Sequence, residues 1–432
     1  MGFLRTTFLV AIAAIVITKI PTLFTPKLPV IIGGKVEPGF EGVLDTFRAN
    51  YESGLELPES GSAFAVYYKG RKVVDIWGGY ADAEALQPWK NDTMAVVFSV
   101  TKGMAALCMA ILSDRGQLQY DERVAHYWPE FGQNDKEDVT VRMLLNHEAG
   151  LAMTDPPLSI ELLKHYEELG NVLAASPPMW QPGTEHGYHA ITFSLYASQL
   201  LSRVDPQHRT LGQFFKEEVA EPFGIEFYIG LPSELNYRVS RFFTASTNLF
   251  LMMWTSLADP VNRRLFWDMF VSGESILPAV IENCGDVCDN MYRLNDPDYR
   301  AIEMGSHSGI GTANGLAKVY SILANGGKTK DGKTLLSEQM IKQLVNGANA
   351  SRKDKVIGAS SKYSTGFTYL QFKDRELFGH PGAGGNMAYT DIENQLGVAY
   401  VTRYQSAYGF GNDPRFVALQ IALQNCVSKL NG

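Results

Sequence analysis

The sequence predicts an α/β protein of the α+β type, in which a mainly antiparallel sheet is assembled from both ends of the chain and flanked by helices. Three observations predict this fold. Runs rich in β-forming residues stand near both ends, amphipathic helical patterns fill most of the region between them, and 432 residues suffice for one large domain with an insertion.

The composition is that of a compact globular protein. Hydrophobic residues make up 45% of the chain and charged residues 19%, which leaves too many core formers for a disordered protein. The formal net charge of −8 is spread along the chain, without the Lys/Arg cluster or the aromatic and basic stripe that nucleic-acid binding needs. We therefore expect no nucleic acid among its partners.

Residues 1–20 are predicted to be a signal peptide or a short membrane anchor. Arg5 precedes an unbroken apolar run at 8–17, and Lys19 follows it. No A-x-A cleavage pattern follows, which favours an uncleaved anchor, and a buried N-terminal helix is the alternative. We expect a secretory or membrane-anchored location, with membrane association through the N-terminus, and a mitochondrial location as the alternative. The Pro-rich residues 21–40 are expected to form a linker.

Strand signals mark both ends of the remaining chain, which is expected to be one domain over residues 41–432. The segment 62–82 holds two β-rich runs around the turn residues Lys69 and Gly70, which predicts a hairpin. The segment 367–405 holds three further strand-like runs separated by polar or Gly-rich turns. The sheet is therefore assigned to residues 41–117 and 346–432, and the helical region to residues 118–345.

Helical periodicity dominates the middle of the chain. From Met104 the apolar positions recur at i, i+3, i+4, i+7 and i+8, and Gly116 provides a C-terminal stop, which predicts an amphipathic helix. The apolar stretch 242–260 is expected to be a buried helix, with a cover over a pocket or a lipid contact as the alternative. Similar patterns predict helices at 141–147, 191–204, 314–327 and 413–430.

The four cysteines, Cys108, Cys284, Cys288 and Cys426, are too few for a disulfide scaffold in a chain of this length. Cys284 and Cys288 either close a small loop disulfide in an oxidising compartment or remain free thiols. No second Cys or His pair stands at ligand spacing near them, so we expect no metal site. No cofactor is expected either.

A Ser-x-x-Lys sequence, from Ser99 to Lys102, opens the helix predicted after it and occurs once in the chain. Residues three apart share a helix face, so the amine can reach the hydroxyl. A partly desolvated lysine loses its preference for the charged form and can act as a base, and a helix N-terminus favours the developing alkoxide. The motif alone is weak, because a chain of this length contains about one such match by chance.

The surrounding sequence resembles the penicillin-recognising serine hydrolases, which include class C β-lactamases, DD-peptidases, β-lactamase-like esterases and mitochondrial β-lactamase-like proteins of animals. The likeness covers about residues 60 to 425 in the family's order. It runs through NDTMAVVFSVTKGMAALCMAILSDRGQLQYDERVAHYWPEF, VTVRMLLNHEAGL, WQPGTEHGYHAITFSLYASQLL, GIGTANGLAKVYSILANGG and LFGHPGAGGNMAYTDIENQLGVAYV. The resemblance implies a β-lactamase/transpeptidase-like fold.

The resemblance also implies roles for three side chains. Ser99 would be the acyl-accepting nucleophile and Lys102 its proton partner. Tyr188-His189-Ala190 stands where the family has Tyr-x-Asn, so Tyr188 would be the phenolic general acid/base, its pKa lowered by the Lys102 ammonium. A packed aromatic in a helix-entry loop is the alternative for Tyr188.

The family's third motif, Lys-Thr-Gly or His-Thr-Gly, reads His380-Pro381-Gly382 here. By resemblance, the backbone N–H groups of Ser99 and Ala383 would form an oxyanion hole, which typically contributes more rate than any single side chain. His380 and Gly382 would line the substrate site, where glycine lets the chain come close to the substrate.

Two departures from the family pattern narrow the expected substrate. Ala190 replaces an amide that holds the lysine and the substrate, and His380 with Pro381 replaces the cation and hydroxyl that bind a β-lactam's carboxylate. The expected function is therefore a serine hydrolase of esters or related acyl bonds, acting on a small-molecule or peptide substrate. The alternatives are a catalytically inactive, membrane-tethered scaffold and a true β-lactamase or DD-peptidase.

Nearby histidines offer a different catalytic arrangement. His186 and His189 flank Tyr188 and invite a Ser-His-Asp triad, but the chain has no G-x-S-x-G elbow. His147 falls where the family carries a structural turn, so we expect it to be structural. The Ser-Lys-Tyr arrangement is therefore preferred, with the triad as the alternative.

Overall fold

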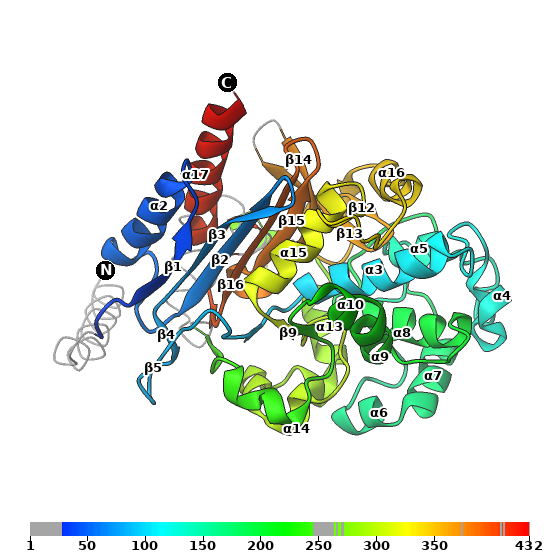
Figure 1. The fold of residues 1–432 in the computed structure, drawn as a ribbon. Coiled ribbons are helices and arrows are strands. Elements are labelled where there is room, and N and C mark those ends of the chain that lie inside the picture. Colours follow the sequence, from blue (N-terminus) through cyan, green and yellow to red (C-terminus); the bar gives the residue numbers. More distant parts are fainter. Residues whose placement is uncertain are drawn as a thin grey trace, which may run out of the picture.

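The computed structural model describes residues 28–244, 263–264, 267–268, 272–372, 375–406, 408 and 411–431. Its centre is an eight-stranded sheet in which each neighbouring pair of strands is antiparallel (Figure 1). In spatial order the strands are β1 (Ile32–Val36), β3 (Arg71–Gly78), β2 (Ser62–Tyr68), β16 (Leu396–Thr402), β15 (Met387–Asp391), β14 (Arg375–Pro381), β13 (Phe367–Phe372) and β12 (Tyr363–Ser364). Pairing of β2 with β16 joins the two ends of the chain, which confirms the predicted fold class.

The predicted hairpin is formed by β2 and β3, with Lys69 and Gly70 as its turn. Both turn residues have positive φ, 51° and 73°, as expected for a two-residue turn that follows the strand twist. At the other end of the chain, the segment 367–405 contains four long strands, where the sequence predicts three. Antiparallel pairing of Phe372 with Arg375 divides the first stretch into β13 and β14.

β1 lies within residues 21–40, which the sequence assigns to a linker, so that assignment is wrong for Ile32–Val36. The strand contains Gly33 and Gly34, which weaken its intrinsic signal. Pairing with β3 along its whole length supplies the extended conformation instead. A partner strand that lies far away in the sequence leaves no local pattern to recognise.

Helices cover both faces of the sheet (Figure 1). α2 (Glu41–Glu52) and α17 (Pro414–Asn431) cover one face, above a core that strands β2, β3, β15 and β16 complete. α3 (Val100–Asp114) and α15 (Ala313–Ala324) pack on the other face and share a larger core with the helical region. The sheet is therefore buried on both sides.

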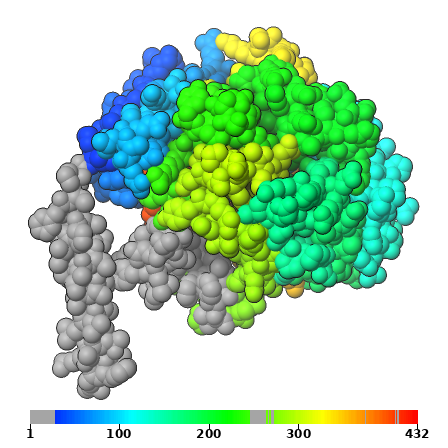
Figure 2. Space-filling view, turned by 90° about the horizontal axis from the view of Figure 1, so that it is seen from below, coloured from blue at the N-terminus to red at the C-terminus, as the bar shows by residue number. Residues whose placement is uncertain are grey.

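The helical region forms much of the face shown in Figure 2, beside the N-terminal strands in blue. The helices predicted at 141–147, 191–204, 314–327 and 413–430 are confirmed as α5, α8, α15 and α17. Together with α5 (Val141–Leu145) and α8 (Phe193–Val204), the helices in and beside this region are α4 (Val124–Tyr127), α6 (Ile160–Lys164), α7 (Tyr166–Ala175), α9 (Leu211–Phe215), α10 (Glu221–Phe223), α13 (Leu277–Asn283), α14 (Pro297–Arg300) and α16 (Glu338–Asn346).

Short strands also lie outside the central sheet, both in the region that the sequence assigns to the sheet and within residues 118–345, which it assigns to helices. Three of them, β6 (Ala95–Val96), β9 (Ile310–Gly311) and β7 (Phe227–Tyr228), form a small sheet at the N-terminal end of α3. The others are β4 (Tyr80–Asp82), β5 (Gln87–Pro88), β8 (Phe243–Thr244), β10 (Arg352–Lys353), β11 (Ser360–Ser361) and β17 (Tyr404–Gln405).

Two predictions fall on residues that the structure does not describe. The signal peptide or anchor at 1–20 lies wholly outside the described residues, and so does the apolar stretch 242–260 from residue 245 onward. Within the described ranges, no helix combines the length and the apolar character needed to cross a membrane.

Cys284 and Cys288 form a disulfide, which decides between the two alternatives that the sequence leaves open. The bond links the end of α13 to the turn that follows it. Asn283, beside the bond, exchanges two hydrogen bonds of 2.9 Å with the backbone of Thr154. The disulfide loop is thereby fastened to the helical region.

An ion-pair network is buried between the sheet and α17. Arg415 lies 2.7 Å from Asp413 and 3.3 Å from Glu56, and all three residues are at most 2% exposed. The same guanidinium donates to the carbonyl oxygen of Gly384 at 2.8 Å. The network therefore ties the N-terminus of α17 to the loop that follows β14.

We predict that Arg415→Met lowers the free energy of unfolding by about 3–5 kcal/mol, because two carboxylates remain buried without their cation. Urea denaturation at pH 7 measures this loss. Arg48→Met is the matched control, since Arg48 pairs with Asp45 at the surface, and it should cost less than about 1 kcal/mol. Equal losses in the two variants would contradict the prediction.

Candidate active site

α3 presents both residues of the Ser-x-x-Lys sequence at its N-terminus. Ser99 immediately precedes the helix, and Lys102 lies in its first turn. The helix predicted from Met104 onward is confirmed, but its predicted amphipathic character is wrong, because the residues from Val100 to Leu112 are all buried. α3 packs against α8 on one side and β14 on the other, and no polar face is left for solvent.

The residue before Ser99 has an unusual backbone conformation. Phe98 has φ of 50°, in the left-handed region that bulky residues seldom occupy. Its ring packs edge to face on Phe242, with centroids 5.6 Å apart. Such conformations concentrate at functional sites, and this one lies at the turn from β6 into α3.

Lys102 is fully buried and is held by three polar contacts. Its Nζ lies 3.2 Å from Ser99 Oγ and donates to the carbonyl oxygens of Ala190 at 2.7 Å and Ser306 at 2.8 Å. None of these partners within the described chain is a carboxylate. The amine is therefore positioned by uncharged groups.

Burial lowers the pKa of Lys102 well below its usual value of 10.5. A neutral amine has two N–H donors and one lone pair. The two carbonyls of Ala190 and Ser306 match the donors, which leaves the lone pair for the hydroxyl of Ser99. The arrangement is suited to removing the Ser99 proton.

Tyr188 lies against Lys102, whose Nζ is 4.8 Å from the ring centroid. The sequence predicts that the ammonium lowers the pKa of Tyr188, and this prediction is wrong in direction. Burial raises the pKa of Tyr188 well above 10, and the charge of Asp354 adds to the rise, while a hydrogen bond with Ser99 opposes it. Because burial removes the water that would stabilise a phenolate, Tyr188 is a neutral phenol.

Asp354 fixes the backbone at Tyr188. Its buried carboxylate accepts a hydrogen bond from the Tyr188 N–H at 3.0 Å and another from the Tyr363 hydroxyl at 2.9 Å. It also accepts the N–H groups of Val356 and Ile357, at 2.9 Å each. The sequence did not predict a role for Asp354, because no spacing pattern links it to Tyr188, which lies 166 positions earlier in the chain.

Two of the neighbouring histidines hold backbone groups. The Leu151 N–H donates to His189 Nε2 at 3.0 Å, and the His189 N–H donates to His147 Nδ1 at 3.1 Å. Burial, assisted by Lys102, lowers the pKa of His189 to about 3. Both rings are therefore neutral supports, and His147 has a contact that suits the expected structural role.

His186 is oriented away from the role of a catalytic base. Asn349 Nδ2 donates to its Nδ1 at 3.3 Å, so the ring proton is on Nε2, which lies 3.1 Å from the Arg352 carbonyl oxygen and 3.1 Å from Ser361 Oγ. A nitrogen that carries a proton cannot accept one from a serine. Within the described chain, neither His186 nor His189 supports the triad alternative for Ser99.

The loop after β14 brings the third motif next to Ser99. A Cβ atom at Gly382 would lie 2.3 Å from the Val97 carbonyl oxygen, so only glycine permits this approach of β14 to the start of α3. The Gly382 N–H donates to the Asn386 carbonyl at 2.7 Å, and Asn386 Nδ2 donates to the Ala383 carbonyl at 3.2 Å. These bonds fix the loop that carries the Ala383 N–H.

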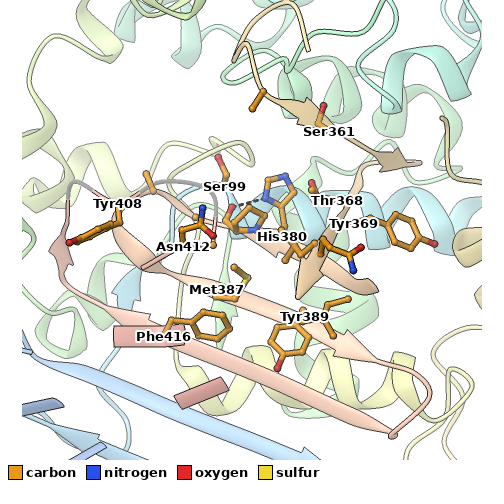
Figure 3. Close-up of a pocket in the computed structure, with 18 of the residues that line it drawn as sticks. Ser99, Ser361, Thr368, Tyr369, His380, Met387, Tyr389, Tyr408, Asn412 and Phe416 are labelled. Atoms are coloured by element: carbon orange, nitrogen blue, oxygen red, sulfur yellow. Dashed lines mark hydrogen bonds between the residues drawn. The ribbon is translucent and has the colours of Figure 1, made fainter. Parts of the chain in front are cut away.

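A cavity of about 520 Å³ opens at Ser99 (Figure 3). None of the described residues that line it is Asp, Glu, Lys or Arg. Its volume suits a small-molecule ligand. The structure brings the predicted site residues together, with Lys102 behind Ser99 and the others lining the cavity, namely Ser99, Tyr188, His380, Gly382 and Ala383.

Known proteins share this fold and much of this sequence. The Beta-lactamase family model matches residues 54–422. "Esterase/beta-lactamase LipL" of Mycobacterium tuberculosis (strain ATCC 25618 / H37Rv) is 30% identical over 374 residues, which cover 85% of this chain and 82% of LipL.

Solved structures agree with this likeness. A family VIII carboxylesterase has a TM-score of 0.79 and 33% identity, covering 92% of this chain and 100% of its own. EstA from Arthrobacter nitroguajacolicus Rue61a has a TM-score of 0.77 and 29% identity, covering 93% of this chain and 100% of its own. Because the family model spans most of its length, the chain belongs to the Beta-lactamase family.

Proposed function

We propose that this protein is a serine hydrolase that cleaves neutral esters through an acyl-enzyme on Ser99. The observation that carries the proposal is the buried Lys102 amine, 3.2 Å from Ser99 Oγ and held by two carbonyl groups. The similar proteins support it, since LipL is named an esterase and a β-lactamase and one structural relative is a carboxylesterase.

In the acylation step, neutral Lys102 takes the Ser99 proton while Oγ attacks the ester carbonyl carbon. The carbonyl oxygen becomes an oxyanion, and the backbone N–H groups of Ser99 and Ala383 would stabilise it. When the C–O bond breaks, the leaving alkoxide takes a proton from Tyr188, which recovers one from Lys102. An acyl-enzyme and a free alcohol result.

In the deacylation step, the same groups work in reverse. A water molecule gives a proton to the Tyr188 and Lys102 pair and attacks the acyl carbon. The tetrahedral intermediate then expels Ser99 Oγ, which regains its proton. The carboxylic acid leaves and the resting enzyme is restored.

Neutral substrates fit the cavity better than anionic ones. Burial, together with Lys102, lowers the pKa of His380 to about 3, so this residue supplies no cation at neutral pH. The described wall contains no Lys or Arg to pair with a carboxylate. β-Lactams and peptidoglycan stems carry carboxylates, so β-lactamase or DD-peptidase activity is the less favoured function.

We predict that Ser99→Ala abolishes labelling by a fluorophosphonate and lowers kcat/KM for p-nitrophenyl acetate by at least about 10³-fold. Gel fluorescence and initial rates measure the two effects. Ser361→Ala is the matched control, because Ser361 is a second hydroxyl in the cavity and contacts His186, and it should keep the label. If only Ser361→Ala lost the label, Ser361 and not Ser99 would be the nucleophile. If the wild type were not labelled, the inactive scaffold would be favoured.

We predict that kcat/KM rises with pH to a plateau, because the neutral form of Lys102 is the base. Burial lowers the pKa of this amine, so the rise should be complete well below pH 10.5. His189 and His380 have pKa values of about 3 and cannot produce a rise near neutral pH. A pH profile of ester hydrolysis tests this, and Lys102→Arg should remove both the activity and the rise. Retention of the wild-type profile in Lys102→Arg would contradict the assignment.

We further propose that residues 1–20 direct the protein to the secretory pathway or anchor it to a membrane. The apolar run after Arg5 supports this, as does the disulfide at Cys284 and Cys288, because disulfides persist in oxidising compartments. The full chain is expected to remain in the membrane pellet after alkaline carbonate extraction, whereas a chain beginning at residue 28 should be released. Equal release of both would exclude the anchor and leave a cleaved signal peptide, which N-terminal sequencing of the secreted protein would identify. Mitochondrial recovery of the full chain would contradict the proposal.

A further inference from the structure

The active-site cavity extends to the opposite face of the sheet. Leu377, Met387 and Tyr389 line it and belong to the core between the sheet and α17. Phe378 and Ala388, their neighbours in the sequence, belong to the core on the α3 side. Because successive side chains of a strand point to opposite faces, the cavity has walls on both faces of the sheet.

The two parts of the cavity meet at the end of the hairpin formed by β14 and β15. Pro381 and Met387 are the last pair of this ladder, and the connecting residues Gly382, Ala383 and Gly384 also line the cavity. The loop that carries the proposed oxyanion donor therefore borders the far part as well. One continuous cavity therefore runs from Ser99 past this loop to the far face of the sheet.

The far part of the cavity has a mostly hydrocarbon wall, and the polar residues Ser406 and Asn412 line the cavity near the start of α17. Figure 3 shows Met387 between Ser99 and the rings of Tyr389 and Phe416 in this view. The hydroxyl of Tyr389 already bonds to Gln420, so it adds no free polar group to the wall. We define the apolar lobe as the lining formed by Leu370, Leu377, Met387, Tyr389, Phe416 and Val417.

We propose that the apolar lobe binds a hydrocarbon chain of the substrate, so that the enzyme prefers neutral esters with an alkyl group long enough to reach Met387 and Phe416. This inference rests on the proposed esterase function. A peptide or charged group would leave its polar atoms without partners in the lobe. Each buried methylene, in contrast, improves binding by up to about fourfold.

Two ester series test the proposal and show whether the bound hydrocarbon chain belongs to the acyl group or to the alcohol of the ester. One series varies the acyl group, from p-nitrophenyl acetate to p-nitrophenyl octanoate, and the other varies the alcohol, from ethyl acetate to octyl acetate. We expect kcat/KM to rise by at least about tenfold along one series, which identifies the chain as acyl or alkoxy. An active enzyme that shows no rise in either series would overturn the inference and leave the esterase function standing.

A lobe-filling variant with a matched control locates the effect. Val417 lines the lobe on α17, and Val417→Trp should reduce the preference for the long ester over the short one by at least about tenfold. Ile421 lies one helical turn later, is 38% exposed and is not part of the cavity wall, so Ile421→Trp should keep the wild-type preference. If Val417→Trp and Ile421→Trp show the same preference for the long ester over the short one, the placement of the hydrocarbon chain in the apolar lobe is wrong.

A binding measurement keeps the inference testable without turnover. Calorimetry with Ser99→Ala should show octyl acetate or p-nitrophenyl octanoate binding at least about tenfold tighter than the corresponding short ester. Adding Val417→Trp should remove that difference. If the wild type hydrolyses no ester while Ser99→Ala still prefers the long ester, the proposed function fails and the lobe assignment stands. If Ser99→Ala shows no preference, the lobe assignment fails.

Discussion

The buried amine of Lys102 is the constraint on which the site depends. An ammonium cannot be placed among apolar side chains of α3 without a large desolvation cost, unless a carboxylate accompanies it or the amine loses its proton. In this fold burial lowers the pKa of Lys102, and carbonyl groups from Ala190 and Ser306 meet at Nζ. Those two residues lie on separate segments of the helical region, so its docking on α3 holds the Lys102 amine beside Ser99, as the proposed base and nucleophile require.

A second constraint links the site to the far side of the sheet. Gly382 approaches the Val97 carbonyl so closely that a Cβ atom at this position would clash, so the end of β14 packs directly against the segment that leads into α3. Behind the same loop, Arg415 donates to the Gly384 carbonyl and forms ion pairs with Glu56 and Asp413. One buried guanidinium therefore contributes both to the packing of α17 and to the position of the loop that carries the proposed oxyanion donor.

The sequence revealed those features that have a local pattern. Periodicity and turn residues predicted the β2 and β3 hairpin and the main helices, and ordered motifs predicted the group around Ser99. It could not reveal Ser306 or Asp354, which act through a carbonyl oxygen and a lone carboxylate brought in by tertiary packing. It also failed on the pKa of Tyr188, because the spacing of charges is visible in a sequence whereas burial is not.

The same balance of burial and charge determines what the site can bind. Burial lowers the pKa of Lys102 well below 10.5 and the pKa of His380 to about 3. The cationic forms of these two groups near Ser99 are therefore disfavoured. An anionic substrate would lose its hydration without gaining an opposite charge, whereas an alkyl ester loses little and gains the contact surface around Met387. The burial that suits Lys102 to the proposed role of a base therefore also favours uncharged substrates, and the proposed chemistry and specificity of the site share one physical origin.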